Sequence, residues 1–92
     1  MDMLDGAEKI LKYTSNFDFD KFVENEMVID AVARNYEIIG EAANHPQVRR
    51  LSITGFRNRI IHEYFGIDYE IMWTIIEENI AELIGELKRL MN

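Results

Sequence analysis

The fold is decided by the stretch WTIIEENIAELIGELKRL, which runs from Trp73 to Leu90. Its main apolar residues are spaced by three, four, three, four and three positions, which keeps them on one side of a helix. Asp68 precedes the stretch and is a residue type that caps helix N-termini. The spacing therefore predicts a long amphipathic helix that buries Trp73, Ile76, Ile80, Leu83, Leu87 and Leu90.

Helical periodicity recurs in the rest of the chain. We expect helices at about residues 2–15, 26–44 and 53–64, and a helical turn through Phe22 that begins at Asp18 or Asp20. The sequence thus predicts one domain over residues 1–92, an all-α, up-and-down bundle of four main helices plus a short helical turn. The stripes expected to face the core are Met3, Leu4, Ala7, Ile10 and Leu11 in the first helix and Val28, Ala31, Val32, Ile38, Ile39 and Ala42 in the second.

The composition is that of an acidic protein without cysteine. The chain has 92 residues, of which 48% are hydrophobic, a formal charge of -7 and a pI near 4.7. The lack of cysteine excludes disulfides, cysteine-bound zinc and a thiol nucleophile. The sequence has no basic leader with an apolar stretch and no apolar run of about 18 residues, so we expect a cytoplasmic protein without a membrane segment.

A basic window interrupts this acidic chain. No Asp or Glu occurs from Ala42 to His62, and the window carries +4, so the rest of the chain carries -11. An island of this kind favours a local anion site over a general polyanion-binding surface, and a phosphodiester is the obvious anion. The candidate phosphate-binding residues are Arg49, Arg50 and Arg59, and the window also holds Arg57, His45 and His62.

Three residues of this window have the chemistry for cutting RNA. His62 can accept and return a proton near neutral pH, and Arg57 can bind two phosphate oxygens with its planar fork. Asn58 lies four residues before His62, so it can orient the imidazole or donate to the phosphate. Because RNA carries its own nucleophile, the 2′-hydroxyl, no metal ion is needed. A histidine at a helix end is also a common partner of the helix dipole, and that plainer interpretation stands beside the catalytic one.

Surplus apolar residues predict an oligomer. Ile61, Ile71, Ile75, Ile84 and Met91 lie off the main stripes, where they would either meet a second subunit or cover loops of the same one. Residues five apart on a helix are rotated by about 140°, so Arg57 and His62 do not stack within one helix. A homodimer interface would supply the cleft in which they converge.

The sequence resembles the HepT-like toxins of the HEPN superfamily of helical ribonucleases. Arg57 to Tyr64 matches the family motif Arg-x4-His-x-Tyr, and it is followed by Phe65-Gly66, another part of the family signature. Ile38-Ile39-Gly40-Glu41-Ala42 is similar to the family segment on the preceding helix, and Trp73 fits as well. Two departures are a chain that begins close to its first helix and a short link between Asn44 and Ser52 that lacks the usual tryptophan.

This resemblance implies a metal-independent endoribonuclease toxin of a type VII toxin–antitoxin system, with Arg57, Asn58 and His62 as catalytic residues and no cofactor. It also implies a homodimer and a cognate MntA-type nucleotidyltransferase antitoxin, with which the toxin can form a larger hetero-oligomer. The antitoxin would neutralise the toxin by transferring AMP to Tyr64. Two alternatives stay open: a non-catalytic helical module that binds a nucleotidyltransferase and its nucleotide, and a purely structural bundle.

Overall fold

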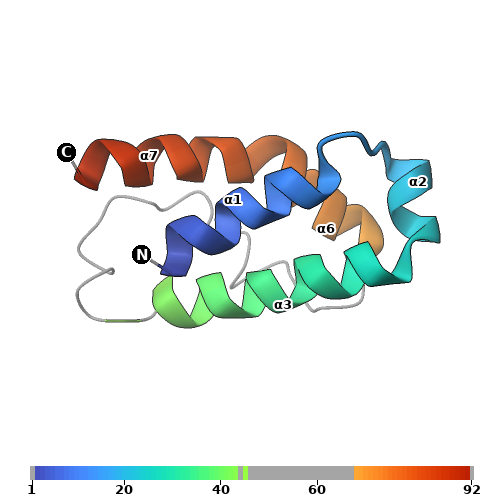
Figure 1. The fold of residues 1–92 in the computed structure, drawn as a ribbon, viewed down its shortest axis with the longest axis horizontal. Helices are drawn as coiled ribbons and strands as arrows, with labels where there is room; N and C mark the ends of the chain where they lie inside the picture. The colour runs from blue at the N-terminus through green and yellow to red at the C-terminus, as the bar shows by residue number, and fades with distance from the viewer. Residues whose placement is uncertain (1, 44, 46–67, 92) are drawn as a thin grey trace.

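The computed structural model describes residues 2–43, 45 and 68–91, and every element in these ranges is helical (Figure 1). The all-α prediction is therefore confirmed. The expected helix at 53–64 lies outside the described residues. The elements are α1 (Asp2–Thr14), α2 (Phe19–Glu24), α3 (Glu26–Ala43), α6 (Tyr69–Ile75), the π-helical segment η1 (Ile76–Ile80) and α7 (Ala81–Met91).

Side-chain caps fix where three of these helices begin. The Asp18 carboxylate accepts a hydrogen bond from the Lys21 backbone N–H at 2.8 Å and so starts α2. The Asn25 side-chain oxygen accepts from the Val28 N–H at 3.1 Å at the start of α3. The Asp68 carboxylate accepts from the Ile71 N–H at 3.1 Å at the start of α6. Each cap satisfies a backbone donor that has no partner inside its helix, which explains why these boundaries can be read from the sequence.

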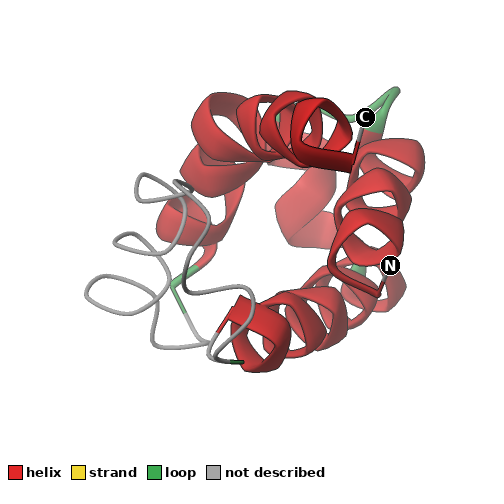
Figure 2. Cartoon of the chain, turned by 90° about the vertical axis from the view of Figure 1, so that its left-hand side faces the viewer, coloured by secondary structure: helices red, strands yellow, loops and turns green. Residues whose placement is uncertain are grey.

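α1 contacts both of the other long helical stretches. α1 contacts α3 on one side and η1 and α7 on the other, and it runs antiparallel to both α3 and α7 (Figure 1). Figure 2 looks along the helices and shows them around a shared centre, with the two chain ends on neighbouring helices. The side chains in that centre are almost all apolar, and each contributes about 1.5–3 kcal/mol by leaving water. Fully buried members include Met3, Ile10, Val32, Ile39, Met72, Ile80 and Leu87.

A π-helical segment shifts the buried face of the last helix. In η1 the hydrogen bonds join residues five apart, so such residues lie on one face. Ile75 and Ile80 accordingly are both fully buried, and Met72 joins them. The expectation that Ile75 belongs to a surplus apolar face is therefore wrong. The expected seam also differs at its ends, because Trp73 is only half-buried and Leu90 is 49% exposed.

A glycine allows α1 and α3 to approach each other. A Cβ atom added to Gly6 would lie 3.1 Å from Cγ1 of Ile39 and 3.5 Å from Oδ1 of Asn35. Asn35 is itself buried, and its side-chain amide donates to the Ala31 carbonyl at 2.8 Å. The contact between α1 and α3 thus depends on a residue without a side chain.

None of the helices in the described ranges is both long enough and apolar enough to cross a membrane.

Candidate functional site

The sequence places the candidate site between the end of α3 and the start of α6. All of the residues predicted to act on RNA or to accept AMP belong to the segment 46–67, which lies outside the described residues: Arg49, Arg50, Arg57, Asn58, Arg59, His62 and Tyr64. The described residues supply the frame from which this segment starts and to which it returns. That frame has a defined geometry at both ends.

The C-terminal end of α3 is anchored in the core. Ile39 is fully buried and Ala43 is 3% exposed, whereas Glu41, between them, faces solvent. The backbone N–H of His45 donates to the Ala42 carbonyl at 3.1 Å, which extends the hydrogen bonding past the last helical residue. The last turn of α3 therefore keeps one face in the core.

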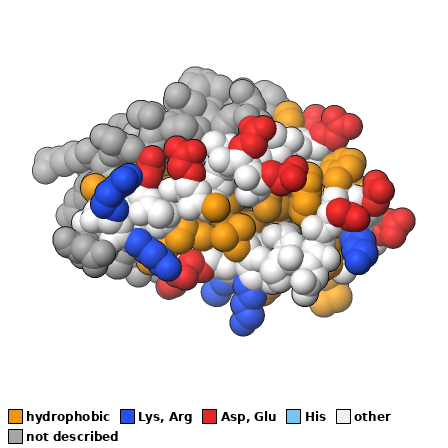
Figure 3. Space-filling model, turned by 90° about the horizontal axis from the view of Figure 1, so that it is seen from above, with side chains coloured by type: hydrophobic (Ala, Val, Ile, Leu, Met, Phe, Trp, Pro, Cys, Tyr) orange, Lys and Arg blue, Asp and Glu red, His pale blue; other side chains and the backbone are white. Residues whose placement is uncertain are grey.

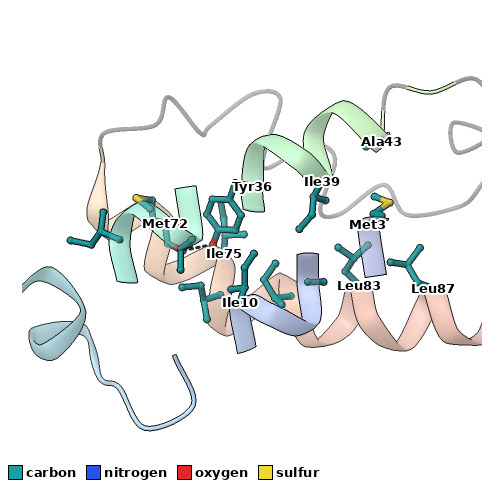
Figure 4. Close-up of a cluster of buried hydrophobic side chains, with 14 of the residues drawn as sticks. Met3, Ile10, Tyr36, Ile39, Ala43, Met72, Ile75, Leu83 and Leu87 are labelled. Atoms are coloured by element: carbon teal, nitrogen blue, oxygen red, sulfur yellow. Dashed lines mark hydrogen bonds between the residues drawn. The ribbon is translucent and has the colours of Figure 1, made fainter. Parts of the chain in front are cut away.

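The start of α6 is tied directly to α3. The buried hydroxyl of Tyr36 donates to the Met72 carbonyl at 2.7 Å, across 36 positions of sequence (Figure 4). Met72 is also fully buried, so both partners of this bond lie in the core. Since Tyr36 lies on α3 and Met72 on α6, the bond helps to fix the relative positions of the two helices that flank the candidate site. Ile75 and Ile39 pack in the same cluster (Figure 4).

The charges of the molecule are divided between this frame and the segment it flanks. The described residues hold 16 of the 17 acidic residues and 6 of the 10 basic ones, so their formal charge is -10. The remaining basic residues are the four arginines of segment 46–67. The net negative charge of the described residues disfavours the approach of a polyanion.

The described residues contain no group of three or more His, Cys, Asp or Glu side chains arranged to hold a metal ion. The two histidines of the chain, His45 and His62, belong to different parts of it, and of these the structure describes His45, which is exposed.

Three hollows lie on the described surface, and the sequence predicted none of them. One of about 320 Å³ lies between α1 and α3 and has a polar lining that includes Asp5, Lys9 and Glu41. Another of about 300 Å³ is lined by Phe17, Lys21, Glu24 and Asn25. The third, of about 240 Å³, lies between α2 and α6 and is lined by Phe19, Glu70, Trp73 and Thr74.

The third hollow has an aromatic wall. Trp73 packs against the fully buried Phe22, with ring centroids 5.3 Å apart and ring planes inclined by 38°. Trp73 was expected in the core seam, and the structure instead gives it one covered side and one side toward the hollow. The sequence signal that could have revealed this hollow is the cluster of Phe17, Phe19 and Phe22 before α3.

Comparison with protein families gives a match over almost the whole chain. The model of the family described as "Ribonuclease HepT-like" matches residues 3–47 and 43–90. The match includes both the described frame and the segment that holds the Arg-x4-His-x-Tyr motif. It confirms the family resemblance that the motif predicted.

Individual relatives agree with the family match. "Putative RNase MJ1380" of Methanocaldococcus jannaschii is 35% identical over 95% of this chain and 88% of its own length. "Putative RNase TTE0752" of Caldanaerobacter subterraneus is 33% identical over 97% of this chain and 88% of its own. "Probable ribonuclease HepT" of Thermococcus cleftensis is 31% identical over 97% of this chain and 89% of its own. No solved structure matches the chain significantly.

Proposed function

On the premise that this chain belongs to the ribonuclease HepT-like family, we propose that it is a metal-independent endoribonuclease and the toxin of a type VII toxin–antitoxin system. The family match over residues 3–90 carries this proposal. The complete motif supports it, because Arg57, Asn58 and His62 are all present and a module that had lost catalysis would be expected to lack at least one. The proposed place of action is the cytoplasm, in contact with cellular RNA.

The proposed reaction is a transesterification within the RNA strand. His62 accepts the proton of a 2′-hydroxyl, whose oxygen attacks the adjacent phosphorus and forms a 2′,3′-cyclic phosphate. The bond from phosphorus to the 5′-oxygen of the next nucleotide breaks, and that oxygen takes a proton from an imidazolium. Arg57 binds the phosphate oxygens and stabilises the charge that builds on them. DNA lacks the 2′-hydroxyl and is not a substrate.

The remaining basic residues would hold the RNA. Arg59, Arg49 and Arg50 lie in the same segment as the motif and would bind phosphates on either side of the scissile one. The charge contrast supports this assignment, because the frame carries -10 whereas segment 46–67, with four arginines and Glu63, carries +3. Binding should weaken steeply as salt rises.

Cleavage of a labelled RNA in excess EDTA tests the mechanism. We expect full activity without divalent metal and 2′,3′-cyclic phosphate ends or their hydrolysis products. His62→Ala should lower the rate by about 10² to 10⁴, the usual contribution of general acid–base catalysis. Arg57→Lys should also lose most activity, because an ammonium group cannot bind two phosphate oxygens as a guanidinium does.

Matched controls for both variants lie in the described frame. His45→Ala removes the other histidine, and Arg34→Lys makes the same change at an exposed position of α3. Both should cleave RNA at the unmutated rate. Full activity in His62→Ala, or activity that EDTA abolishes, would refute the mechanism. A folded, unmutated protein that cuts no RNA would favour the non-catalytic module that binds a nucleotidyltransferase and its nucleotide.

We further propose that a cognate MntA-type nucleotidyltransferase neutralises this toxin by transferring AMP from ATP to Tyr64. The added phosphate would place negative charge near Arg57 or Arg59 and compete with the substrate phosphate. Intact-mass spectrometry after incubation with the partner and ATP should show an AMP-sized gain. Tyr64→Phe should show none, whereas Tyr69→Phe, which removes an exposed tyrosine five residues further on, should be modified normally. An AMP-sized mass gain that persists in Tyr64→Phe would show that another residue accepts the AMP.

A further inference from the structure

The hollow between α2 and α6 combines an aromatic wall with a carboxylate. Phe19 contributes from α2, and Trp73 and Glu70 contribute from α6. Phe19 and Trp73 are half-buried, so each keeps part of its ring accessible, whereas Glu70 is exposed at the rim. The fully buried Phe22 packs against Trp73 and helps to hold the indole in place. We call this hollow the α2–α6 pocket.

The polar groups of the α2–α6 pocket offer acceptors. The hydroxyl hydrogen of Thr74 is already used, because Thr74 Oγ1 donates to the Glu70 carbonyl at 2.8 Å. The Glu70 carboxylate and the face of the Trp73 ring are left to meet a ligand. A carboxylate pairs with a guanidinium or an ammonium group, and an indole face attracts the same cations. The pocket therefore matches a ligand that is apolar in part and positively charged in part.

The charges around the pocket also favour a positively charged ligand. The segments that form it, residues 18–24 and 68–78, carry seven acidic residues and one basic residue, a formal charge of -6. Figure 3 shows hydrophobic side chains bordered by acidic ones at the end of the molecule where α2 lies. A surface of this kind attracts cationic groups and repels nucleic acid. The acidic residues are Asp18, Asp20, Glu24, Asp68, Glu70, Glu77 and Glu78, and the basic residue is Lys21.

We propose that the α2–α6 pocket is a docking site for a basic, amphipathic segment of a protein partner. An apolar side chain of that segment would enter between Phe19 and Trp73, and a neighbouring arginine or lysine would pair with Glu70. This inference goes beyond the proposed ribonuclease activity, since the described residues that line the pocket lie outside the segment 46–67 that holds the Arg-x4-His-x-Tyr motif. Loss of docking would leave RNA cleavage unchanged, so the two proposals can fail separately.

Trp73 makes the proposal directly measurable because it is the sole tryptophan of the chain. The probe is a synthetic amphipathic peptide of leucine and arginine, and its control is the same peptide with glutamate in place of arginine. The Leu/Arg peptide should shift the Trp73 emission to shorter wavelength, protect it from acrylamide and bind saturably. Binding should weaken when the ionic strength rises from about 0.05 to about 0.5 M, because salt screens exposed charges.

Two variants test the pocket itself. Glu70→Gln should weaken peptide binding by about two- to fivefold, as expected for one exposed ion pair. Phe19→Ala should weaken it by about tenfold, as expected for an aromatic side chain at an interface. Glu82→Gln is the matched control, since it removes the same charge from an exposed position on α7, and it should bind normally. Circular dichroism checks that each variant keeps its helices.

Several results would overturn the proposal. Equal binding of the Leu/Glu peptide would show that the surface does not select for positive charge. An equal loss of peptide affinity in Glu70→Gln and Glu82→Gln would show that the peptide is attracted to the acidic protein as a whole and not to this pocket. An unchanged Trp73 spectrum with the Leu/Arg peptide would show that no docking occurs. A shift of the same size with an RNA oligonucleotide would assign the pocket to nucleic acid.

Discussion

At the scale of single residues, Tyr36 joins the two helices that flank the candidate site. Its hydroxyl donates to the Met72 carbonyl at 2.7 Å in the core. Met72 also accepts the backbone N–H of Ile76, so its carbonyl keeps one partner when the hydroxyl is removed. Tyr36→Phe should therefore lower the free energy of unfolding by about 1 kcal/mol. In a domain of this size, thermal denaturation should show a fall in Tm of about 4–8 °C.

Tyr13→Phe serves as the control for that measurement. Tyr13 is 39% exposed, so removal of its hydroxyl should change Tm little. Because Tyr36 fixes the frame and does not touch RNA in the proposed mechanism, Tyr36→Phe should retain cleavage at a temperature well below its Tm. Equal Tm values for Tyr36→Phe and the unmutated protein would show that the bond contributes nothing to stability.

At the scale of elements, alanine substitutions at two helical glycines distinguish the intrinsic helix preference of a residue from the effect of packing. An added Cβ at Gly85 on α7 would have no atom within 4 Å, whereas one at Gly6 on α1 would lie 3.1 Å from Ile39. Alanine at either position removes the conformational freedom of glycine, which is worth about 1 kcal/mol in a helix interior. Gly85→Ala should therefore raise the free energy of unfolding by this amount. Gly6→Ala should raise it less, or lower it, because the Ile39 side chain must move.

Denaturant unfolding of the two variants, compared with the unmutated protein, measures this difference. The slope of free energy against denaturant should be equal in all three, so that the midpoints can be compared directly. A larger gain from Gly6→Ala than from Gly85→Ala would contradict the close packing of α1 on α3.

At the scale of the whole molecule, apolar surface that the described bundle does not cover predicts a homodimer. Leu90 is 49% exposed, and Ile71 and Ile84 pack against the core but keep part of their surface exposed, whereas Ile75 is fully buried and does not count toward this surface. Light scattering after size exclusion at micromolar concentration should give about twice the chain mass of 10.8 kDa. A dimer would let the Arg57 and His62 pairs of two subunits form one cleft.

The proposed interface involves the segment around residues 53–64. Ile61→Asp should therefore lower the measured mass toward that of one chain, because it places a charge in an apolar contact. Met27→Asp makes the same kind of change at a residue that is 83% exposed at the start of α3, and it should leave the mass unchanged. A single-chain mass for the unmutated protein would exclude the dimer.

The sequence by itself determined the helical class, several helix boundaries and the family. Asp18, Asn25 and Asp68 start their helices through bonds to backbone groups only three residues away. Local bonds of this kind depend on little beyond the neighbouring residues, so Asp68 could be recognised as a cap before the fold was known, and the choice for α2 was narrowed to Asp18 or Asp20. The family was recognisable because its motif depends on residue type and spacing, from Arg57 to Tyr64.

The tertiary structure alone decided which apolar stripe faces the core. Of the residues expected to face the core from α3, Val32 and Ile39 are fully buried, whereas Val28, Ala31, Ile38 and Ala42 are half-buried. The core is also lined by Ile29, Tyr36 and Ala43, which belong to an overlapping stripe. In the last helix the π-helical segment turned Met72 and Ile75 inward and left Trp73 to line the α2–α6 pocket. Neighbouring stripes on one helix are similarly apolar, so the periodicity of the sequence cannot show which of them is buried. Packing against other helices chooses between them, because the shape of a partner surface is a property of the folded chain.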